Sequence, residues 1–220
     1  MTGLVVLANT RILDVRKGIL ADTQDIVIER DRIIDINRNA TLKNDHRRID
    51  LKGKISLPGL CDAHVHVTAA TPNFPELMRW SPYYTAARAS EILRNMLMRG
   101  FTTVRDAGGA EFGLARAVEE GFLTGPRILF CGKALSQTGG HGDMREPGEN
   151  FESCLCCAGL GRVCDGVSAV RNACRDEIRK GANQIKIMAS GGVASPTDRI
   201  SSSQFSLEEI SAAVEEATNA

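Results

Sequence analysis

At Lys54-Ile-Ser-Leu-Pro-Gly-Leu-Cys-Asp-Ala-His-Val-His-Val67, the pattern of secondary structure that the sequence predicts changes. After it, short segments rich in β-branched residues alternate with segments of helical periodicity as far as residue 220. Repeated strand-plus-helix units bury their strands between helices and therefore favour a parallel sheet, either open or closed as a barrel. Residues 56–220 hold about four such units, roughly half of what an eight-unit barrel needs.

The individual elements follow from periodicity and from the glycines that end them. Strands are expected over residues 101–105, 127–131 and 184–188, and helices over residues 85–99, 112–120, 165–179 and 206–220. The last helix opens with the capping-box pattern Ser206-Leu-Glu-Glu209, ahead of an apolar face formed by Ile210, Ala213 and Ala217. The predicted fold class is α/β, a partial (β/α)8 TIM barrel.

The segment before residue 56 predicts a separate, all-β module. Residues 26–29 and 33–36 are rich in isoleucine and flank Arg30-Asp31-Arg32, which indicates a hairpin. Residues 37–50 are polar and are expected to form a surface loop. We therefore predict two domains, with residues 1–55 as the N-terminal part of a β-sandwich module and residues 56–220 as the first half of a barrel.

Composition excludes several classes of protein. The chain has 220 residues, 27 basic and 27 acidic side chains and 43% hydrophobic residues, which argues against a disordered or nucleic-acid-binding protein. It has no apolar run of the roughly 20 residues that span a bilayer, so no membrane partner is expected. The start of the chain lacks the pattern of a signal peptide, which predicts a cytoplasmic location. The seven cysteines are then expected as free thiols.

A cluster of cysteines at residues 154–164 raises the possibility of a zinc knuckle. Cys154-Leu-Cys156-Cys157 does not match the paired spacing of a zinc finger, and no second pair follows. An irregular loop is the favoured interpretation of this cluster.

His64 and His66 are the strongest chemical signal in the chain. They lie two residues apart in the strand-like run Ala63-His-Val-His-Val67, so their side chains are expected on one face of the strand. Two imidazoles at this spacing can bind one metal ion, whereas Val65 and Val67 would pack against the helices. The alternative is a pair of surface histidines on an edge strand.

Lys186 lies in the middle of the predicted strand Gln184-Ile-Lys-Ile-Met188, between isoleucines expected to face the helices. An inward-facing lysine is costly to bury in its charged form, which favours the neutral amine. A neutral amine can add carbon dioxide to form a carbamate, and this anionic group can bridge two metal ions. Pairing with an acidic neighbour, or extension of the side chain toward solvent, is the alternative.

Two further histidines differ in their surroundings. His141 lies in the glycine-rich segment Thr138-Gly-Gly-His-Gly-Asp143, which follows the third predicted strand of the barrel. Active sites of barrels form at this end of the strands, so His141 is a candidate for contact with a substrate carbonyl or carboxylate, with a flexible surface loop as the alternative. His46 lies among charged residues and is interpreted as a solvated loop histidine.

Together these motifs resemble the amidohydrolase superfamily, in particular the branch of imidazolonepropionase-like hydrolases and metal-dependent Xaa-Pro dipeptidases. The resemblance rests on residues 57–66, 100–109, 138–143 and 184–192. It implies a (β/α)8 barrel with a β-sandwich built from both ends of the chain. It also implies a binuclear centre, usually two zinc ions, that hydrolyses an amide or related C–N bond of a small-molecule or dipeptide-like substrate.

The resemblance assigns roles residue by residue. It implies that His64 and His66 are metal ligands from the first strand, that Lys186 is the carboxylated lysine and that His141 meets the substrate. The same pattern continues with two more histidines and an aspartate that acts as general base, none of which has a counterpart before residue 220. The catalytic aspartate is therefore expected beyond residue 220.

Two interpretations of the chain follow. The first is the N-terminal half of a metal-dependent hydrolase with an incomplete active site. The second is a non-catalytic half-barrel that acts as a binding or self-pairing module, which allows for a homo-oligomer.

Overall fold

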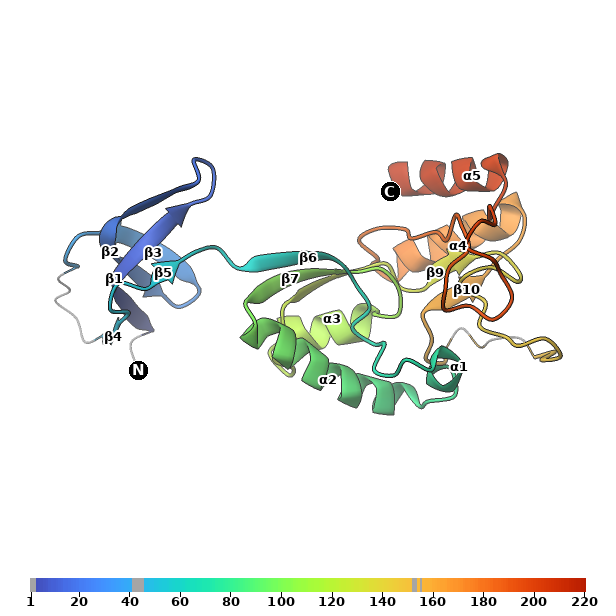
Figure 1. Cartoon of the computed structure of the whole chain (residues 1–220), viewed down its shortest axis with the longest axis horizontal. Helices are drawn as coiled ribbons and strands as arrows, with labels where there is room; N and C mark the ends of the chain where they lie inside the picture. The colour runs from blue at the N-terminus through green and yellow to red at the C-terminus, as the bar shows by residue number, and fades with distance from the viewer. Residues whose placement is uncertain (1–2, 41–45, 152–153, 155) are drawn as a thin grey trace. The chain divides into compact units, whose positions relative to one another are not determined.

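The computed structural model describes residues 3–40, 46–151, 154 and 156–220. The chain divides into two compact units, Met1–Pro58 and Gly59–Ala220 (Figure 1). Each unit is described separately below.

The first unit is built around one mixed sheet. Its strands are β1 (Leu4–Asp14), β2 (Ile19–Glu29), β3 (Arg32–Asn37), β4 (Arg47–Asp50) and β5 (Ile55–Ser56). The order is β3-β2-β1-β4, with β2 antiparallel to both β1 and β3, whereas β4 and β5 pair with β1 in parallel. The predicted hairpin forms, since β2 and β3 pair up to Glu29 and Arg32 and enclose a two-residue turn.

The predicted loop over residues 37–50 is wrong in part, because its end forms β4. Residues 41–45 of that loop lie outside the described residues. β4 is held in place by an ion pair of 2.8 Å between Arg48 and the buried Asp25. Asp25 also accepts the N–H groups of Asn9 and Ala40, so a single carboxylate joins three segments of this unit. Such long-range partners leave no local pattern in the sequence.

The second unit begins with a three-stranded parallel sheet. Its strands are β6 (Leu60–Val65), β7 (Phe101–Asp106) and β8 (Arg127–Phe130), in the order β6-β7-β8. The connecting helices are α1 (Phe74–Leu77), α2 (Pro82–Met98) and α3 (Phe112–Glu119). All three strands, α2 and α3 agree with the prediction to within a few residues.

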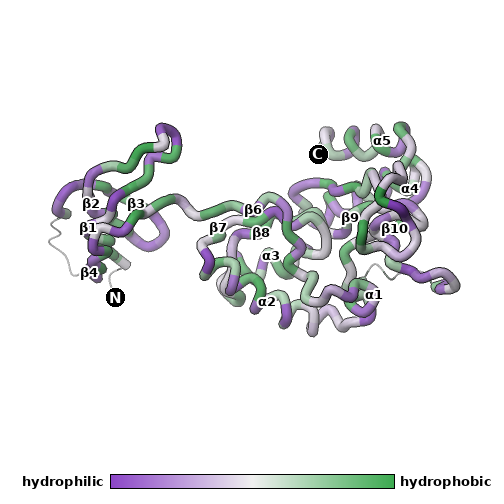
Figure 2. The backbone as a smooth tube through the Cα atoms, viewed as in Figure 1, coloured by the Kyte–Doolittle hydropathy of each residue, from purple (hydrophilic) through white to green (hydrophobic). Residues whose placement is uncertain are grey.

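One hydrophobic cluster holds this part together, and we call it the first core. It consists of Val67, Ala89, Leu93, Met96, Val104, Ala110, Leu114, Ala115, Ile128 and Phe130. Figure 1 shows α2 and α3 on the same side of the β6-β7-β8 sheet, and Figure 2 shows hydrophobic and hydrophilic residues mixed along β6. The helical periodicity of α2 therefore serves to bury one of its faces against the sheet.

The rest of the unit packs around a second core. Two short strands, β9 (Ala134–Ser136) and β10 (Gly161–Val163), pair in parallel, and α4 (Val167–Arg179) and α5 (Leu207–Thr218) pack beside them. The second core consists of Leu135, Cys164, Val170, Ala173, Cys174, Ala212 and Ala213. The predicted capping box is confirmed, because the Ser206 hydroxyl accepts the Glu209 N–H and the Glu209 carboxylate accepts the Ser206 N–H.

Two predicted details of this part are wrong. The expected strand over residues 184–188 is a single bridge between Ile187 and Leu135, because Leu135 alone of β9 exchanges backbone hydrogen bonds with it, through Lys186 and Met188. The predicted helix over residues 165–179 forms as α4, which begins at Val167 since Gly166 has a φ of 83°, outside the helical range. Ala217 is exposed, and Ala212 is buried on α5 in its place.

No helix among the described residues combines the length and the apolar character needed to cross a bilayer.

Candidate functional site

His64 and His66 lie side by side at the carboxyl end of β6. Val67 is buried and Val65 partly buried in the first core, as the alternation along the strand predicts, so the two histidines project from the opposite face. The centroids of their rings are 5.4 Å apart, with an angle of 67° between the ring planes. His64 is exposed and His66 half-buried. The structure thus brings the two predicted imidazoles together.

The ring of His66 is oriented by a backbone carbonyl. Its Nδ1 lies 2.9 Å from the carbonyl oxygen of Gly108. Because a carbonyl only accepts hydrogen bonds, Nδ1 carries the proton and Nε2 keeps the lone pair that a metal ion requires. A side chain at position 108 would prevent this approach, since an added Cβ would lie 2.8 Å from the Leu160 carbonyl oxygen and 3.5 Å from His66 Cε1.

Asp106 stabilises the backbone around His66 through hydrogen bonds. It was not identified as a site residue from the sequence. It is the last residue of β7 and has no exposed surface. Its carboxylate accepts the N–H groups of Val67 at 2.7 Å, Gly108 at 3.0 Å and Ala110 at 3.1 Å. Burial raises the pKa of Asp106, although the three backbone hydrogen bonds act in the opposite direction. The carboxylate therefore fixes both the residue that follows His66 and the glycine that orients its ring.

Lys186 lies beside β9, with Ile185 and Ile187 packed against the second core. Its carbonyl oxygen accepts the Leu135 N–H at 2.8 Å, and its side chain is half-buried. Although His64 is largely exposed, its pKa is lowered, first by partial desolvation of the ring and then by the positive charge of Lys186. The charge of Lys186 therefore acts on His64.

His141 belongs to a separate hydrogen-bond network. Its backbone N–H donates to Gln204 Oε1 at 3.0 Å, and its Nδ1 lies 3.0 Å from the hydroxyl of Ser195. Its ring lies against Gly192, where an added Cβ would be 2.1 Å from His141 Cε1. His141 thus has hydrogen-bond partners through both its backbone and its ring.

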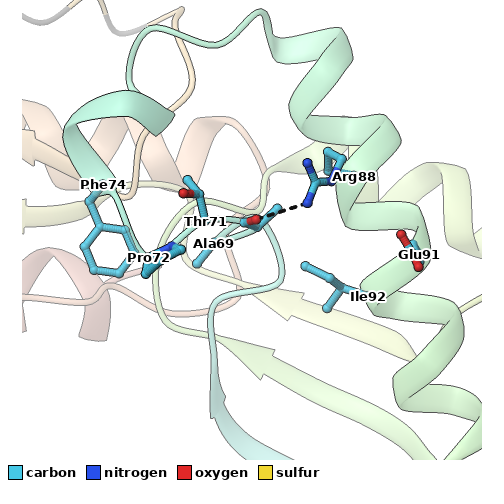
Figure 3. Close-up of a pocket in the computed structure, with 8 residues that line it drawn as sticks. Ala69, Thr71, Pro72, Phe74, Arg88, Glu91 and Ile92 are labelled. Carbon is cyan, nitrogen blue, oxygen red and sulfur yellow. Dashed lines mark hydrogen bonds between the residues drawn. The ribbon is translucent and has the colours of Figure 1, made fainter.

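Two cavities lie near these residues without including them. One, of about 440 Å³, lies between α2 and the loop after β6, where Arg88 donates to the Ala70 carbonyl at 3.4 Å (Figure 3). The other, of about 330 Å³, is lined by Lys133, Glu177 and Lys180 among others. None of the four predicted site residues, all of which the structure describes, lines either cavity.

The cysteine cluster is local and lies outside the predicted site. The sulfur atoms of Cys154, Cys156 and Cys157 lie within 4.8 Å of one another. Cys154 and Cys156 form a disulfide, which corrects the expectation of free thiols for these two residues. Their Cα atoms are 5.3 Å apart, within the range that a disulfide can span. The Lys133 ammonium donates to the carbonyl of Cys157 at 2.9 Å, and burial lowers its pKa.

The comparisons with known proteins agree on one family. Residues 55–220 match the family model described as the amidohydrolase family. Ochratoxinase from Aspergillus niger is 37% identical over 176 residues, which covers 74% of this chain and 37% of that enzyme.

Solved structures give the same result. A prolidase in complex with N-methylphosphonate-L-proline has a TM-score of 0.92 and 48% identity, over 98% of this chain and 54% of that chain. A Xaa-Pro dipeptidase with bound methionine has a TM-score of 0.80 and 29% identity, over 98% of this chain and 54% of that chain. The fold is therefore the α/β fold of these structures, of which the chain spans about half the length.

Proposed function

The chain belongs to the amidohydrolase family, and from this premise we propose that it forms the N-terminal part of a metal-dependent hydrolase of amide or related C–N bonds. The adjacent imidazoles of His64 and His66 are the observation that carries the proposal. The family match and the likeness to a prolidase support the same reaction class. The substrate class we propose is a small molecule or a dipeptide-like compound.

We propose that His64, His66 and Lys186 hold part of a centre of two zinc ions. The donor set suits this group, because imidazole nitrogen is a common zinc ligand and His66 keeps Nε2 unprotonated through its bond to Gly108. When bound, such ions polarise the scissile carbonyl and supply hydroxide at neutral pH. Lys186 would contribute as a carbamate formed with carbon dioxide, which replaces its positive charge beside His64 with a negative one.

The residues of this chain have separable tasks in the proposed reaction. Asp106 and Gly108 hold the ring of His66 in one orientation. His141 is proposed to contact the substrate, and its backbone is fixed by Gln204. The general base is an aspartate that we expect beyond residue 220, so hydrolysis is proposed for the complete protein.

The domain interpretation is also part of the proposal. We propose that residues 1–55 contribute to a β-sandwich and residues 56–220 to a (β/α)8 barrel. The exposed side chains of Ile33, Ile34 and Ile36 on β3 support a further layer against the first unit. The cytoplasmic location, the absence of nucleic-acid and membrane partners and the homo-oligomer stay predictions.

Metal binding tests the proposal directly. Isothermal titration of the chain with zinc should give a site that His64→Ala and His66→Ala each weaken by at least about tenfold. His46→Ala is the matched control, because it removes a histidine of the first unit and should leave zinc binding unchanged. Zinc affinity that is equal in all four proteins would refute the proposed centre and favour the non-catalytic half-barrel. Turnover of dipeptides is then measured on the complete protein.

A further inference from the structure

The network around His141 closes into a ring of hydrogen bonds that reaches beyond the residues named so far. The Ser195 hydroxyl contacts both His141 Nδ1 and the carboxylate of Asp198. The other carboxylate oxygen of Asp198 accepts Gln204 Nε2 at 2.7 Å, and Gln204 Oε1 accepts the His141 N–H at 3.0 Å. Gln204 is only 2% exposed, so this ring is anchored in the interior.

The direction of each hydrogen bond in this ring follows from counting protons. Burial acts to raise the pKa of Asp198, but hydrogen bonds from Ser195, Gln204 and the Gly192 N–H outweigh it and lower that pKa. The ionised carboxylate can only accept hydrogen bonds, so the Ser195 hydroxyl must donate its single proton to Asp198. The Ser195 oxygen can then only accept from His141, which places a proton on Nδ1.

We propose that Ser195 and Asp198 are positioning residues that fix His141 as the Nδ1–H tautomer and aim its Nε2 at the substrate. The inference rests on the proposed substrate-binding role of His141. With Nδ1 committed to Ser195, the ring keeps one orientation whether Nε2 carries a lone pair or a proton. The substrate therefore meets a preorganised group and not a rotating one.

The tautomer of His141 can be measured without metal or turnover. Long-range proton–nitrogen spectra of the labelled chain, recorded with the imidazole in its neutral form, distinguish a proton on Nδ1 from one on Nε2. The wild-type chain should show the Nδ1–H form. Asp198→Ala should convert it to the Nε2–H form, because the hydroxyl of Ser195 is then released to donate to Nδ1. A wild-type ring with its proton on Nε2 would overturn the proposal.

A matched control separates positioning from general stability. Thr197 lies between Ser195 and Asp198, and its hydroxyl donates to the Gly139 carbonyl at 3.3 Å, so it joins the same two segments through a hydrogen bond that does not involve His141. Thr197→Val should keep the Nδ1–H form, and Ser195→Thr should keep it as well because a hydroxyl remains. A change of tautomer in Thr197→Val equal to that in Asp198→Ala would refute the specific role.

Kinetics of the complete protein provide the second readout. Ser195→Ala should raise KM about tenfold with kcat changed by less than about twofold, since it loosens a binding group and leaves the metal ligands intact. Ser195→Thr should restore KM. An unchanged KM in Ser195→Ala would overturn the inference. An Nδ1–H ring in a protein that neither binds zinc nor hydrolyses dipeptides would instead refute the proposed function and leave the tautomer assignment standing.

Discussion

Asp106→Asn removes the charge of a fully buried carboxylate while it preserves the size of the side chain. In the native protein the two carboxylate oxygens accept three backbone N–H groups, from Val67, Gly108 and Ala110. The asparagine Oδ1 can replace the oxygen that serves Gly108 and Ala110. Its amide nitrogen then faces the N–H of Val67, so two donors meet and one buried N–H loses its acceptor.

The expected cost follows from that single unsatisfied donor. A buried N–H without an acceptor costs about 1–3 kcal/mol, and loss of a buried charge offsets part of this, so we expect a decrease of about 1–2 kcal/mol in the free energy of unfolding. Asp106→Ala leaves all three donors unsatisfied and should cost at least about 3 kcal/mol. Because the N–H that loses its acceptor belongs to Val67, the residue directly after His66, zinc affinity in Asp106→Asn should also fall by about 10- to 100-fold.

Urea unfolding followed by circular dichroism in the presence of a chelator measures the free energy of unfolding. Competition with a chromophoric chelator measures the zinc affinity. Asp50→Asn is the control, because Asp50 is exposed in the first unit and accepts the Lys52 N–H far from His66 in sequence. It should change neither quantity by a comparable amount. Identical unfolding midpoints and zinc affinities for Asp106→Asn and the wild type would refute the assigned role of the carboxylate.

Two further predictions concern ionisable groups outside the site. Arg175 and then Arg171 lower the pKa of Glu216 from its ordinary 4.5 to about 2, so its contribution to stability is present above pH 4.5 and is lost as the pH falls through about 2. The acid side of the stability–pH curve, measured by chemical unfolding, should therefore be flatter in Glu216→Gln; an equal slope would contradict this ion pair. Burial raises the pKa of the Cys131 thiol to about 12, whereas Cys61 is exposed. Mass spectrometry after brief treatment with iodoacetamide at pH 8 should find Cys61 modified and Cys131 unmodified, and the reverse order would contradict the burial of Cys131.

The elements that periodicity specifies were predictable from the sequence. The alternation around His64 and His66 gave the correct packing of Val65 and Val67, and the capping box at Ser206 located the start of α5. These features depend on residues within a few positions of one another, so they leave a local pattern.

The features that were missed depend on contacts between distant segments. Asp106 and Val67 are 39 positions apart, and His141 and Ser195 are 54 positions apart. Asp106 is followed by Ala107-Gly-Gly109, and an acidic side chain at the end of a strand is itself a signal for capping of backbone N–H groups. β9 and β10 have three residues each, too few for any periodicity to be detected.

The proposed metal ligands are attached to two different hydrophobic cores of the second unit. His64 and His66 extend from the strand that packs into the first core, whereas Lys186 is flanked by isoleucines of the second, and Gln184 joins the two through its bond of 2.9 Å to the Asp106 carbonyl oxygen. An ion shared by these ligands would bind only when both cores are folded. At a free concentration 100 times its Kd it would add about 2.7 kcal/mol to a single joint transition. Zinc would then couple the folding of the two cores, and its removal would weaken that coupling.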